Sequence, residues 1–422
     1  MITTKAVRMY GKEDLRLEEF PLPEIGEDEI LAEIVSDSIC MSSWKAAEQG
    51  SAHKRVPDDI AEYPVIIGHE FCGRLLKVGS KWQGRYREDS KFAIQPALNY
   101  KGSLAAPGYS YRYIGGDATH IVIPNEVMEQ NCLLDYNGEA YYFGSLAEPM
   151  SCIVGTFHAM YHTVNGSYDH HMGIVPGGSM AILAGAGPMG MGAIDYAIHC
   201  DRKPGLLVVT DIDDARLHRA QSIYTVEEAA AHGVKLVYCN TGSGDAVATL
   251  LGLNGGKGYD DVLVFAPVRP VIEQGDAILG RDGCLNFFAG PSDPKLSATF
   301  NFYNVHYNST HVVGTSGGNT ADMIESLAMM ADGRINPSSM ITHVGGLNCV
   351  PETTLNLPKI SGGKKLIYTQ LEMELTAIDD FAHKGKSDPL FVELARIVEA
   401  AGGLWCPAAE QYLLANGKKL AG

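Results

Sequence analysis

The stretch SMAILAGAGPMGMG, residues 179–192, decides the fold of this chain. It begins with an apolar run of strand character, residues 180–184, and continues into the pattern G-x-G-x-x-G and then a helical pattern. In this context the first glycine permits a tight turn, the second lets backbone approach a pyrophosphate, and the third lets the helix pack on the strand. Alone, the pattern also describes a tight turn that binds no ligand. The positions that we expect to face a dinucleotide are Gly185, Gly187, Pro188, Met189 and Gly190.

A second strand strengthens the dinucleotide interpretation. Residues 206–210, LLVVT, end at Asp211, which stands 21 residues after Gly190. A carboxylate at this position accepts hydrogen bonds from the ribose hydroxyls of NAD, and it repels the 2′-phosphate of NADP. The two features together predict a dinucleotide site that prefers NAD(H).

The strand–helix alternation continues on both sides of this turn. Strands separated by helical patterns predict a parallel sheet with helices on both faces, and the segments expected as its strands are 180–184, 206–210, 235–239, 261–266, 284–289 and 311–315. Upstream, short strands are expected at 6–10, 15–19, 29–36, 74–78 and 119–124, with a long loop at 84–117. Downstream, the pattern favours helices at 319–332 and 389–401 and a strand at 364–369. A further helix is expected at 150–162, and the tail after the last helix shows no clear pattern.

Composition limits the class of protein. The 422 residues are enough for two sizeable domains, and a net charge of −17 argues against nucleic acid and anionic membrane surfaces as partners. Nine scattered cysteines without a C-x-x-C pair are typical of a reducing compartment. The N-terminus has no apolar segment of the kind found in signal peptides. We therefore expect a cytoplasmic enzyme with a small-molecule substrate.

Three separated positions carry the donor types of a catalytic zinc site: Cys40, His69 and Glu148, with Glu70 next to His69. Catalytic zinc takes three protein ligands and leaves a fourth position for water or substrate. Each residue also has an ordinary structural explanation: a buried thiol, a polar Gly-His-Glu turn and a Glu-Pro helix start. Their joint appearance before the nucleotide fold favours the metal interpretation, with Glu70 either a direct ligand or a neighbour that orients one.

This motif set, in this order, resembles the zinc-dependent medium-chain dehydrogenase/reductases, the alcohol and polyol dehydrogenase family. The resemblance covers about residues 1–370 and implies a GroES-like, mainly β catalytic domain from residues 1–160 and 316–422, with a Rossmann domain of residues 161–315 inserted. It also implies a homodimer or homotetramer, and the Glu-Pro form of the third ligand is similar to polyol and threonine dehydrogenases. In the family, a cation at the position of Arg216 lies near the adenosine ribose, which leaves NADP(H) open beside NAD(H).

The chain departs from the family pattern in two places. Residues 84–117 contain no cysteine, so we expect one catalytic zinc and no structural zinc. After Cys40, the usual acid and the usual relay histidine are missing. Ser42 keeps the hydroxyl that the resemblance assigns to proton transfer, while Lys45 is either a replacement relay, a contact for an anionic substrate or a surface lysine.

The Cys-Met-Ser-Ser variant and two C-terminal stretches, at 345–358 and 362–369, are similar to the L-sorbose 1-phosphate reductase subgroup. The resemblance implies zinc-assisted hydride transfer to a ketose phosphate, with Lys45, Lys364 and Lys365 as candidate cationic contacts, although a Lys-Lys pair entering a strand is more often at the surface. Within the enzyme class, a free-polyol or threonine dehydrogenase stays open. A zinc-free reductase and a catalytically inactive nucleotide-binding protein on the same scaffold are the competing interpretations.

Overall fold

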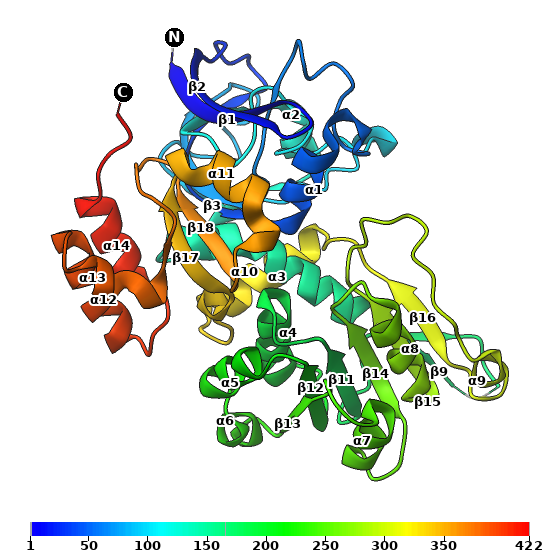
Figure 1. The fold of residues 1–422 in the computed structure, drawn as a ribbon. Helices are drawn as coiled ribbons and strands as arrows, with labels where there is room; N and C mark the ends of the chain where they lie inside the picture. Colours follow the sequence, from blue (N-terminus) through cyan, green and yellow to red (C-terminus); the bar gives the residue numbers. More distant parts are fainter. Residues whose placement is uncertain (1, 165, 422) are drawn as a thin grey trace. The chain divides into compact units, whose positions relative to one another are not determined.

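The computed structural model describes residues 2–164 and 166–421, which form two compact units (Figure 1). One unit comprises Met1–Pro149, Asn319–Ala331 and Pro337–Gly422, and the other comprises Met150–Gly318 and Asp332–Asn336. The chain thus passes between the units at 149/150, 318/319, 331/332 and 336/337, whereas the sequence placed two boundaries, at 160/161 and 315/316. The first boundary falls inside one continuous helix, and no turn or composition change marks it in the sequence.

The nucleotide-type unit contains a six-stranded parallel sheet, in the order β13-β12-β11-β14-β15-β16. The alternation of strand and helix patterns predicted this sheet, and the parallel doubly wound fold is confirmed. Its strands are β11 (Ser179–Leu183), β12 (Leu206–Asp211), β13 (Lys235–Asn240), β14 (Tyr259–Val264), β15 (Leu279–Phe287) and β16 (His311–Gly314). The intervening helices are α4 (Pro188–His199), α5 (Asp214–Ile223), α6 (Val226–Ala231), α7 (Ala246–Leu253), α8 (Arg269–Ala277) and α9 (Phe302–Tyr307). A hairpin of β9 (Tyr161–Thr163) and β10 (His170–Met172) completes the unit.

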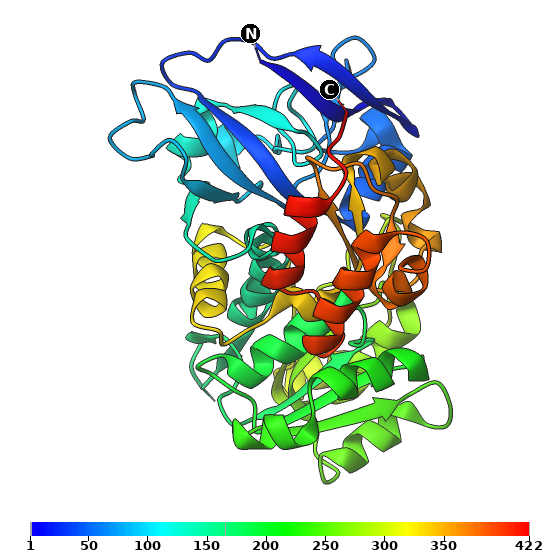
Figure 2. The ribbon, with the colours of Figure 1, turned by 90° about the vertical axis from the view of Figure 1, so that its left-hand side faces the viewer.

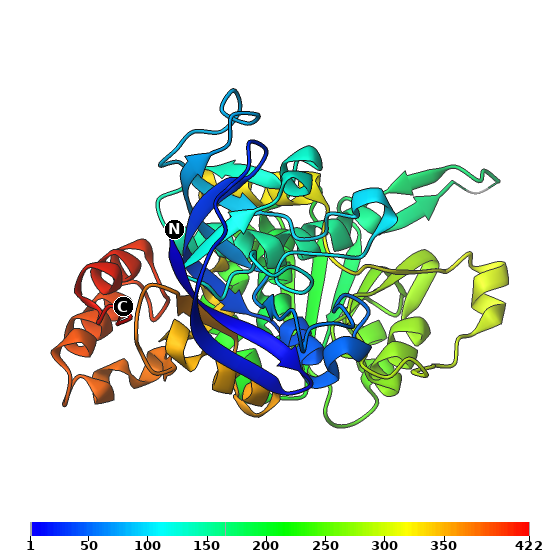
Figure 3. The ribbon, with the colours of Figure 1, turned by 90° about the horizontal axis from the view of Figure 1, so that it is seen from above.

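The other unit is mainly β and draws its larger sheet from both ends of the chain. The strand order is β19-β17-β18-β3-β5-β6-β8, with β7 also on β3, and β18 pairs antiparallel with β3. The strands are β3 (Ile30–Ile39), β5 (Phe71–Val78), β6 (Lys91–Ile94), β7 (His120–Ile123), β8 (Leu133–Tyr136), β17 (Ile341–Gly346), β18 (Lys364–Tyr368) and β19 (Thr376–Ala377). A second, three-stranded sheet contains β1 (Thr3–Gly11), β2 (Asp14–Pro21) and β4 (Val65–Ile66), and Figure 3 shows β1 and β2 from above. This unit has the mainly β architecture that the sequence resemblance implies for its catalytic domain.

Helix α3 and strand β6 correct two expectations from the sequence, and further helices complete this unit. Helix α3 (Tyr141–Ala159) begins well before residue 150 and continues through Pro149, so the Glu-Pro pair is not a helix start. The segment 84–117 contains strand β6 and is not one uninterrupted loop. The remaining helices are α1 (Met41–Gln49), α2 (Asn125–Glu129), α10 (Thr320–Ala331), α11 (Val350–Asn356), α12 (Phe381–Lys384), α13 (Pro389–Ala400) and α14 (Pro407–Asn416). Within residues 2–164 and 166–421, no helix has both the length and the hydrophobicity that crossing a membrane requires.

The helix expected at 389–401 is confirmed as α13, and the tail after it, which the sequence left unplaced, forms α14; α12 precedes both in the C-terminal segment (Figure 2). Glu410 of α14 is buried and accepts hydrogen bonds from the backbone N–H groups of Tyr141 (2.6 Å) and Tyr142 (2.9 Å). It also accepts one from the hydroxyl of Tyr368, which in turn accepts one from the indole of Trp405. A carboxylate beside the first amides of a helix satisfies donors that have no partner within the helix. The tail therefore anchors the start of α3 and the end of β18, the two elements that carry Glu148 and Lys364.

Candidate functional site

The glycine turn has the local geometry of a phosphate-binding loop. Helix α4 starts at Pro188 with Gly187 as its N-cap, so no side chain covers the amide groups of its first turn. A Cβ on Gly187 would meet nothing within 4 Å, which leaves open space where a ligand approaches the backbone. A Cβ on Gly190 would lie 1.9 Å from the carbonyl oxygen of Gly185, so this position requires glycine for the helix to approach the turn. The first turn thus presents free N–H groups to an anion, as pyrophosphate binding needs.

Asp211 lies at the end of β12, and its carboxylate is fixed by backbone amides. It accepts hydrogen bonds from the N–H groups of Ala186 (3.2 Å), Ile212 (2.9 Å) and Asp213 (3.1 Å). The carboxylate is therefore tied directly to the glycine turn. Arg216, in the first turn of α5, has an exposed side chain whose nearest acid is Asp213, at 3.6 Å.

A buried cluster of metal-binding groups lies in the mainly β unit. The donor atoms of Cys40, His69 and Glu70 all lie within 4.8 Å of one another. Cys40 follows β3 and precedes α1, while His69 and Glu70 precede β5. Burial raises the pKa of the Cys40 thiol and lowers that of the His69 imidazole. A thiol and an imidazole held together away from water fit zinc, which binds the deprotonated thiolate and the neutral ring.

His69 is oriented by hydroxyl groups on both of its ring nitrogens. Its Nδ1 lies 3.2 Å from the Ser43 hydroxyl, and its Nε2 lies 3.3 Å from the hydroxyls of Ser42 and Tyr109. The Ser42 hydroxyl also donates to the Cys40 sulfur (3.0 Å) and accepts from Tyr109 (2.9 Å). Nε2 therefore faces the cluster, and Ser43 supplies the outer contact that metal-binding histidines usually make with a carboxylate or a carbonyl.

Glu70 is committed to a buried ion pair. The Lys364 ammonium donates to both carboxylate oxygens of Glu70, and the Ser38 hydroxyl donates to one of them. Both partners are almost inaccessible, with side-chain exposures of 5% for Lys364 and 1% for Glu70. Burial alone would raise the pKa of Glu70 and lower that of Lys364, but the opposite charges reverse both shifts, so both groups stay ionised.

Glu148 lies on α3, is buried, and is not a member of the 4.8 Å cluster. Its pKa is raised to about 7, first by burial and then by the charges of Glu70 and Cys40, while His69 and Lys364 act against the shift. It therefore shares the electrostatic environment of the cluster. The structure brings together Cys40, Ser42, His69 and Glu70. It places Glu148 near enough for the charges of Cys40, His69 and Glu70 to shift its pKa.

The two adjacent lysines of β18 are both buried, so the surface interpretation of the Lys-Lys pair is wrong. Lys365 donates to the carbonyls of Ser361 and Gly363, each at 2.8 Å, and burial lowers its pKa to about 8. Lys364 is held by Glu70. Lys45, on α1, is half-buried, and burial lowers its pKa. Both ammonium groups of β18 thus already have protein partners.

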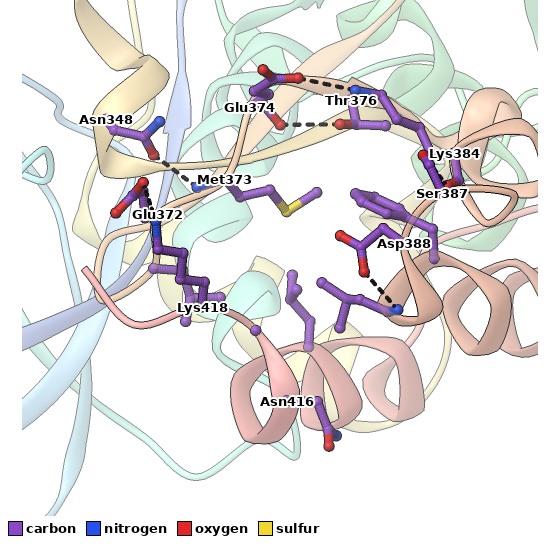
Figure 4. A pocket seen from close by; sticks show the side chains of 15 residues that line it. Asn348, Glu372, Met373, Glu374, Thr376, Lys384, Ser387, Asp388, Asn416 and Lys418 are labelled. Carbon is purple, nitrogen blue, oxygen red and sulfur yellow. Dashed lines mark hydrogen bonds and ion pairs between the residues drawn. The ribbon is translucent and has the colours of Figure 1, made fainter. Parts of the chain in front are cut away.

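A separate pocket of about 500 Å³ lies between the C-terminal helices and the segment 371–376 (Figure 4). Its rim carries two ion pairs, Lys418 with Glu372 (2.6 Å) and Lys384 with Glu374 (3.0 Å). Its apolar side chains include Met373 and Phe391. The described lining residues include none of the candidate metal ligands, so this pocket is distinct from the cluster.

Sequence reasoning missed Ser43, Tyr109 and the partner of Glu70. Ser43 stands three residues after Cys40, and its spacing on α1 was the available signal. Tyr109 lies in a segment rich in Gly, Tyr and Ser, where no pattern distinguishes it from its neighbours. Lys364 is 294 residues from Glu70, a separation that only the pairing of β18 with β3 closes.

Comparison with known proteins gives a consistent result. Residues 188–332 match the family model described as zinc-binding dehydrogenase. The chain is 52% identical to mannitol-1-phosphate 5-dehydrogenase of Aliivibrio fischeri, over 98% of each chain. It is 50% identical to L-sorbose 1-phosphate reductase of Klebsiella pneumoniae, over 100% of this chain and 99% of that protein.

A solved structure from Sinorhizobium meliloti 1021, described as a zinc-binding dehydrogenase bound to NADP, has the same fold. It superposes with a TM-score of 0.71 at 18% identity and covers 87% of this chain and 100% of its own. The two relatives at 52% and 50% identity match essentially the whole chain. The glycine turn and the cluster of Cys40, His69 and Glu70, called the Cys40–His69 cluster below, agree with them. This chain therefore belongs to the zinc-binding dehydrogenase family.

Proposed function

We propose that the chain reduces a ketose phosphate to a hexitol phosphate, or carries out the reverse oxidation, with L-sorbose 1-phosphate as the first substrate to test. The observation that carries this proposal is the pair of relatives at 52% and 50% identity, which are both named for hexose-derived 1-phosphates. Both relatives match essentially the whole chain. Free polyols and threonine remain the alternative substrates within the same enzyme class.

Cys40, His69 and Glu148 are the proposed zinc ligands, and Glu70 the residue that orients them. When bound, zinc supplies Lewis-acid polarisation of the substrate carbonyl, and the nicotinamide supplies or takes the hydride. The Ser42 hydroxyl, 2.9 Å from that of Tyr109, is placed to pass a proton to or from the substrate oxygen. Lys45 is the proposed next group in that relay. A raised pKa for Tyr109, caused by burial, keeps its hydroxyl protonated as a donor.

NAD(H) is the proposed cofactor, because Asp211 presents a fixed carboxylate where the ribose 2′-position of the dinucleotide lies in this fold. Arg216 is exposed on the first turn of α5, which leaves NADP(H) as a weaker second cofactor. We place the protein in the cytoplasm, supported by nine free cysteines, and cell fractionation tests this placement.

The test combines zinc analysis with cofactor oxidation assays. We expect about one zinc per chain, as a single catalytic site requires, and NADH oxidation with L-sorbose 1-phosphate or D-fructose 1-phosphate far above that with the free sugars. Parallel assays with NADPH measure the cofactor preference. Activity on free polyols or threonine would overturn the substrate, and absence of both zinc and turnover would overturn the mechanism.

We also propose that the chain forms a homodimer through the open edge of the six-stranded sheet. β16 is the edge strand, and Val312 on it is exposed. Figure 3 shows the β9–β10 hairpin and α9 projecting at the same end of this unit. Exposed apolar side chains gather there: Val164, Tyr168, Met172, Phe302, Tyr303 and Tyr307. An apolar surface beside an unpaired strand edge favours a second copy, whose β16 would pair antiparallel across a two-fold axis.

Light scattering during gel filtration tests the dimer. We expect twice the chain mass for the wild type and a shift toward the monomer for Val312→Lys, because a charge would be buried at the two-fold contact. Val392→Lys on α13 is the matched control at an exposed valine of the other unit, and it should leave the mass unchanged. A monomeric wild type at micromolar concentration would rule out this interface.

A further inference from the structure

A sugar phosphate needs a cationic partner, and the lysines of β18 do not provide it. The Lys364 ammonium forms a buried ion pair with Glu70, and the Lys365 ammonium donates hydrogen bonds to two backbone carbonyls. A phosphate site must therefore come from other residues near the Cys40–His69 cluster. The segment that follows α1 contains His53, Lys54 and Arg55 in succession.

Tyr109 connects this segment to the cluster. Its hydroxyl contacts Ser42 and His69, as described above, and its ring lies 4.8 Å from the His69 ring. The His53 ring is stacked on Tyr109 at 5.8 Å with an interplanar angle of 12°, and the Arg55 guanidinium carbon lies 5.6 Å from the centre of the same ring. The Tyr109 ring therefore links His53 and the cationic Arg55 side chain to the hydroxyl that contacts His69, a proposed zinc ligand.

The backbone of this segment is fixed. The Ser110 hydroxyl donates to the Arg55 carbonyl at 2.6 Å, and the Arg55 N–H donates to Nδ1 of His53 at 3.3 Å. Ser110 is the direct neighbour of Tyr109, so the same short stretch positions both the ring and the arginine. The site is thus held by contacts from two segments of the chain.

Among the described residues, no carboxylate lies within 4.0 Å of the half-buried Arg55 guanidinium. Burial and the positive charges of Arg55, Lys54 and Lys45 lower the pKa of His53. These three cations therefore lie close enough to His53 to act on it together. By contrast, Arg112 lies on the Tyr63 ring at 3.6 Å and has the carboxylate of Asp59 at 3.9 Å.

We propose that Arg55, assisted by His53, binds the phosphate group of the substrate while the carbonyl lies at the Cys40–His69 cluster. This inference rests on the proposed function and names the residues that select a phosphorylated substrate. A guanidinium binds phosphate through two parallel hydrogen bonds, and the cation–π contact with the Tyr109 ring keeps the Arg55 guanidinium beside the cluster. Because one ring separates Arg55 from the cluster, the arrangement suits a 1-phosphate, whose phosphate is carried on the carbon next to the C2 carbonyl.

The first experiment compares kcat/KM for L-sorbose 1-phosphate and for free L-sorbose in the wild type, Arg55→Gln, Arg55→Lys and Arg112→Gln. In Arg55→Gln, we expect a loss of about 100-fold for the phosphate ester, mainly through KM, and less than about threefold for the free sugar. Arg55→Lys should recover part of the loss, because it restores the charge without the two-pronged geometry. Arg112→Gln, the arginine on the Tyr63 ring, should change neither value.

Equal losses for ester and free sugar in Arg55→Gln, or no loss for the ester, would overturn the role of Arg55. A second measurement separates this from failure of the proposed function. Calorimetric titration with inorganic phosphate should show binding to the wild type that weakens at least about tenfold in Arg55→Gln. If the wild type uses no sugar phosphate but this titration still depends on Arg55, the substrate is wrong and the anion site stands. If phosphate binds both proteins equally, the anion site is wrong.

Discussion

Cys40→Ser is expected to abolish turnover and to reduce the zinc content from about one per chain to a small fraction of that. A hydroxyl is a much poorer zinc donor than a thiolate, and the other donors of the cluster cannot replace it. Losing Lewis-acid polarisation removes several kcal/mol of transition-state stabilisation, so kcat/KM should fall by at least about a thousandfold, roughly 4 kcal/mol. His69→Ala should have the same result. Elemental analysis and NADH oxidation with the substrate identified for the wild type measure both effects.

Two controls make this prediction specific. Binding of NADH, followed by fluorescence, should stay within about threefold of the wild type, since the glycine turn and Asp211 belong to the other unit. Cys349→Ser alters another partly buried thiol of the same unit, whose sulfur donates to the Gly346 carbonyl at 3.2 Å, and it should keep zinc and activity. Near-normal activity of Cys40→Ser with substoichiometric zinc would refute the proposed chemistry.

The parts of the structure that the sequence predicted are those encoded by local patterns. The turn at Gly185–Gly190 and the acid at Asp211 sit at fixed distances from strands whose apolar runs are readable, so the fold and the candidate cofactor site follow from neighbours in the chain. Cys40 and His69 were found through the order of short motifs. In each case the signal lies within a few residues of the feature that it predicts.

The parts that could not be predicted depend on contacts between distant segments. The partner of Glu70 comes from β18, because the antiparallel pairing of β18 with β3 brings the Lys364 ammonium into contact with the Glu70 carboxylate. Helix α3 runs through Pro149 although a proline inside a helix removes one backbone hydrogen bond and its ring crowds the preceding carbonyl, so the buried packing of this helix has to offset that cost. Arg55 gave no signal, because its lack of a carboxylate partner is a property of the folded chain.

Lys364→Met is expected to lower the free energy of unfolding by about 3–5 kcal/mol, the cost of leaving one member of a buried ion pair without its partner. In this variant the Glu70 carboxylate would keep only the Ser38 hydroxyl in a site that is closed to water. Lys384→Met breaks the exposed pair with Glu374 and should cost at most about 1 kcal/mol, because solvent screens that pair. Urea denaturation of the three proteins measures the differences.

The double variant Glu70→Gln/Lys364→Met decides what the pair does for the metal. Removing both charges should restore most of the stability lost in Lys364→Met, because no uncompensated charge stays buried. If Glu70 orients the proposed ligands and does not bind the metal itself, the double variant keeps about one zinc per chain and loses activity only partly, by roughly 10- to 100-fold. If its zinc content instead falls as in Cys40→Ser, Glu70 is a direct ligand and Lys364 holds it in place. Failure of the double variant to recover stability would show that the contribution of Lys364 is packing of its side chain and not its charge.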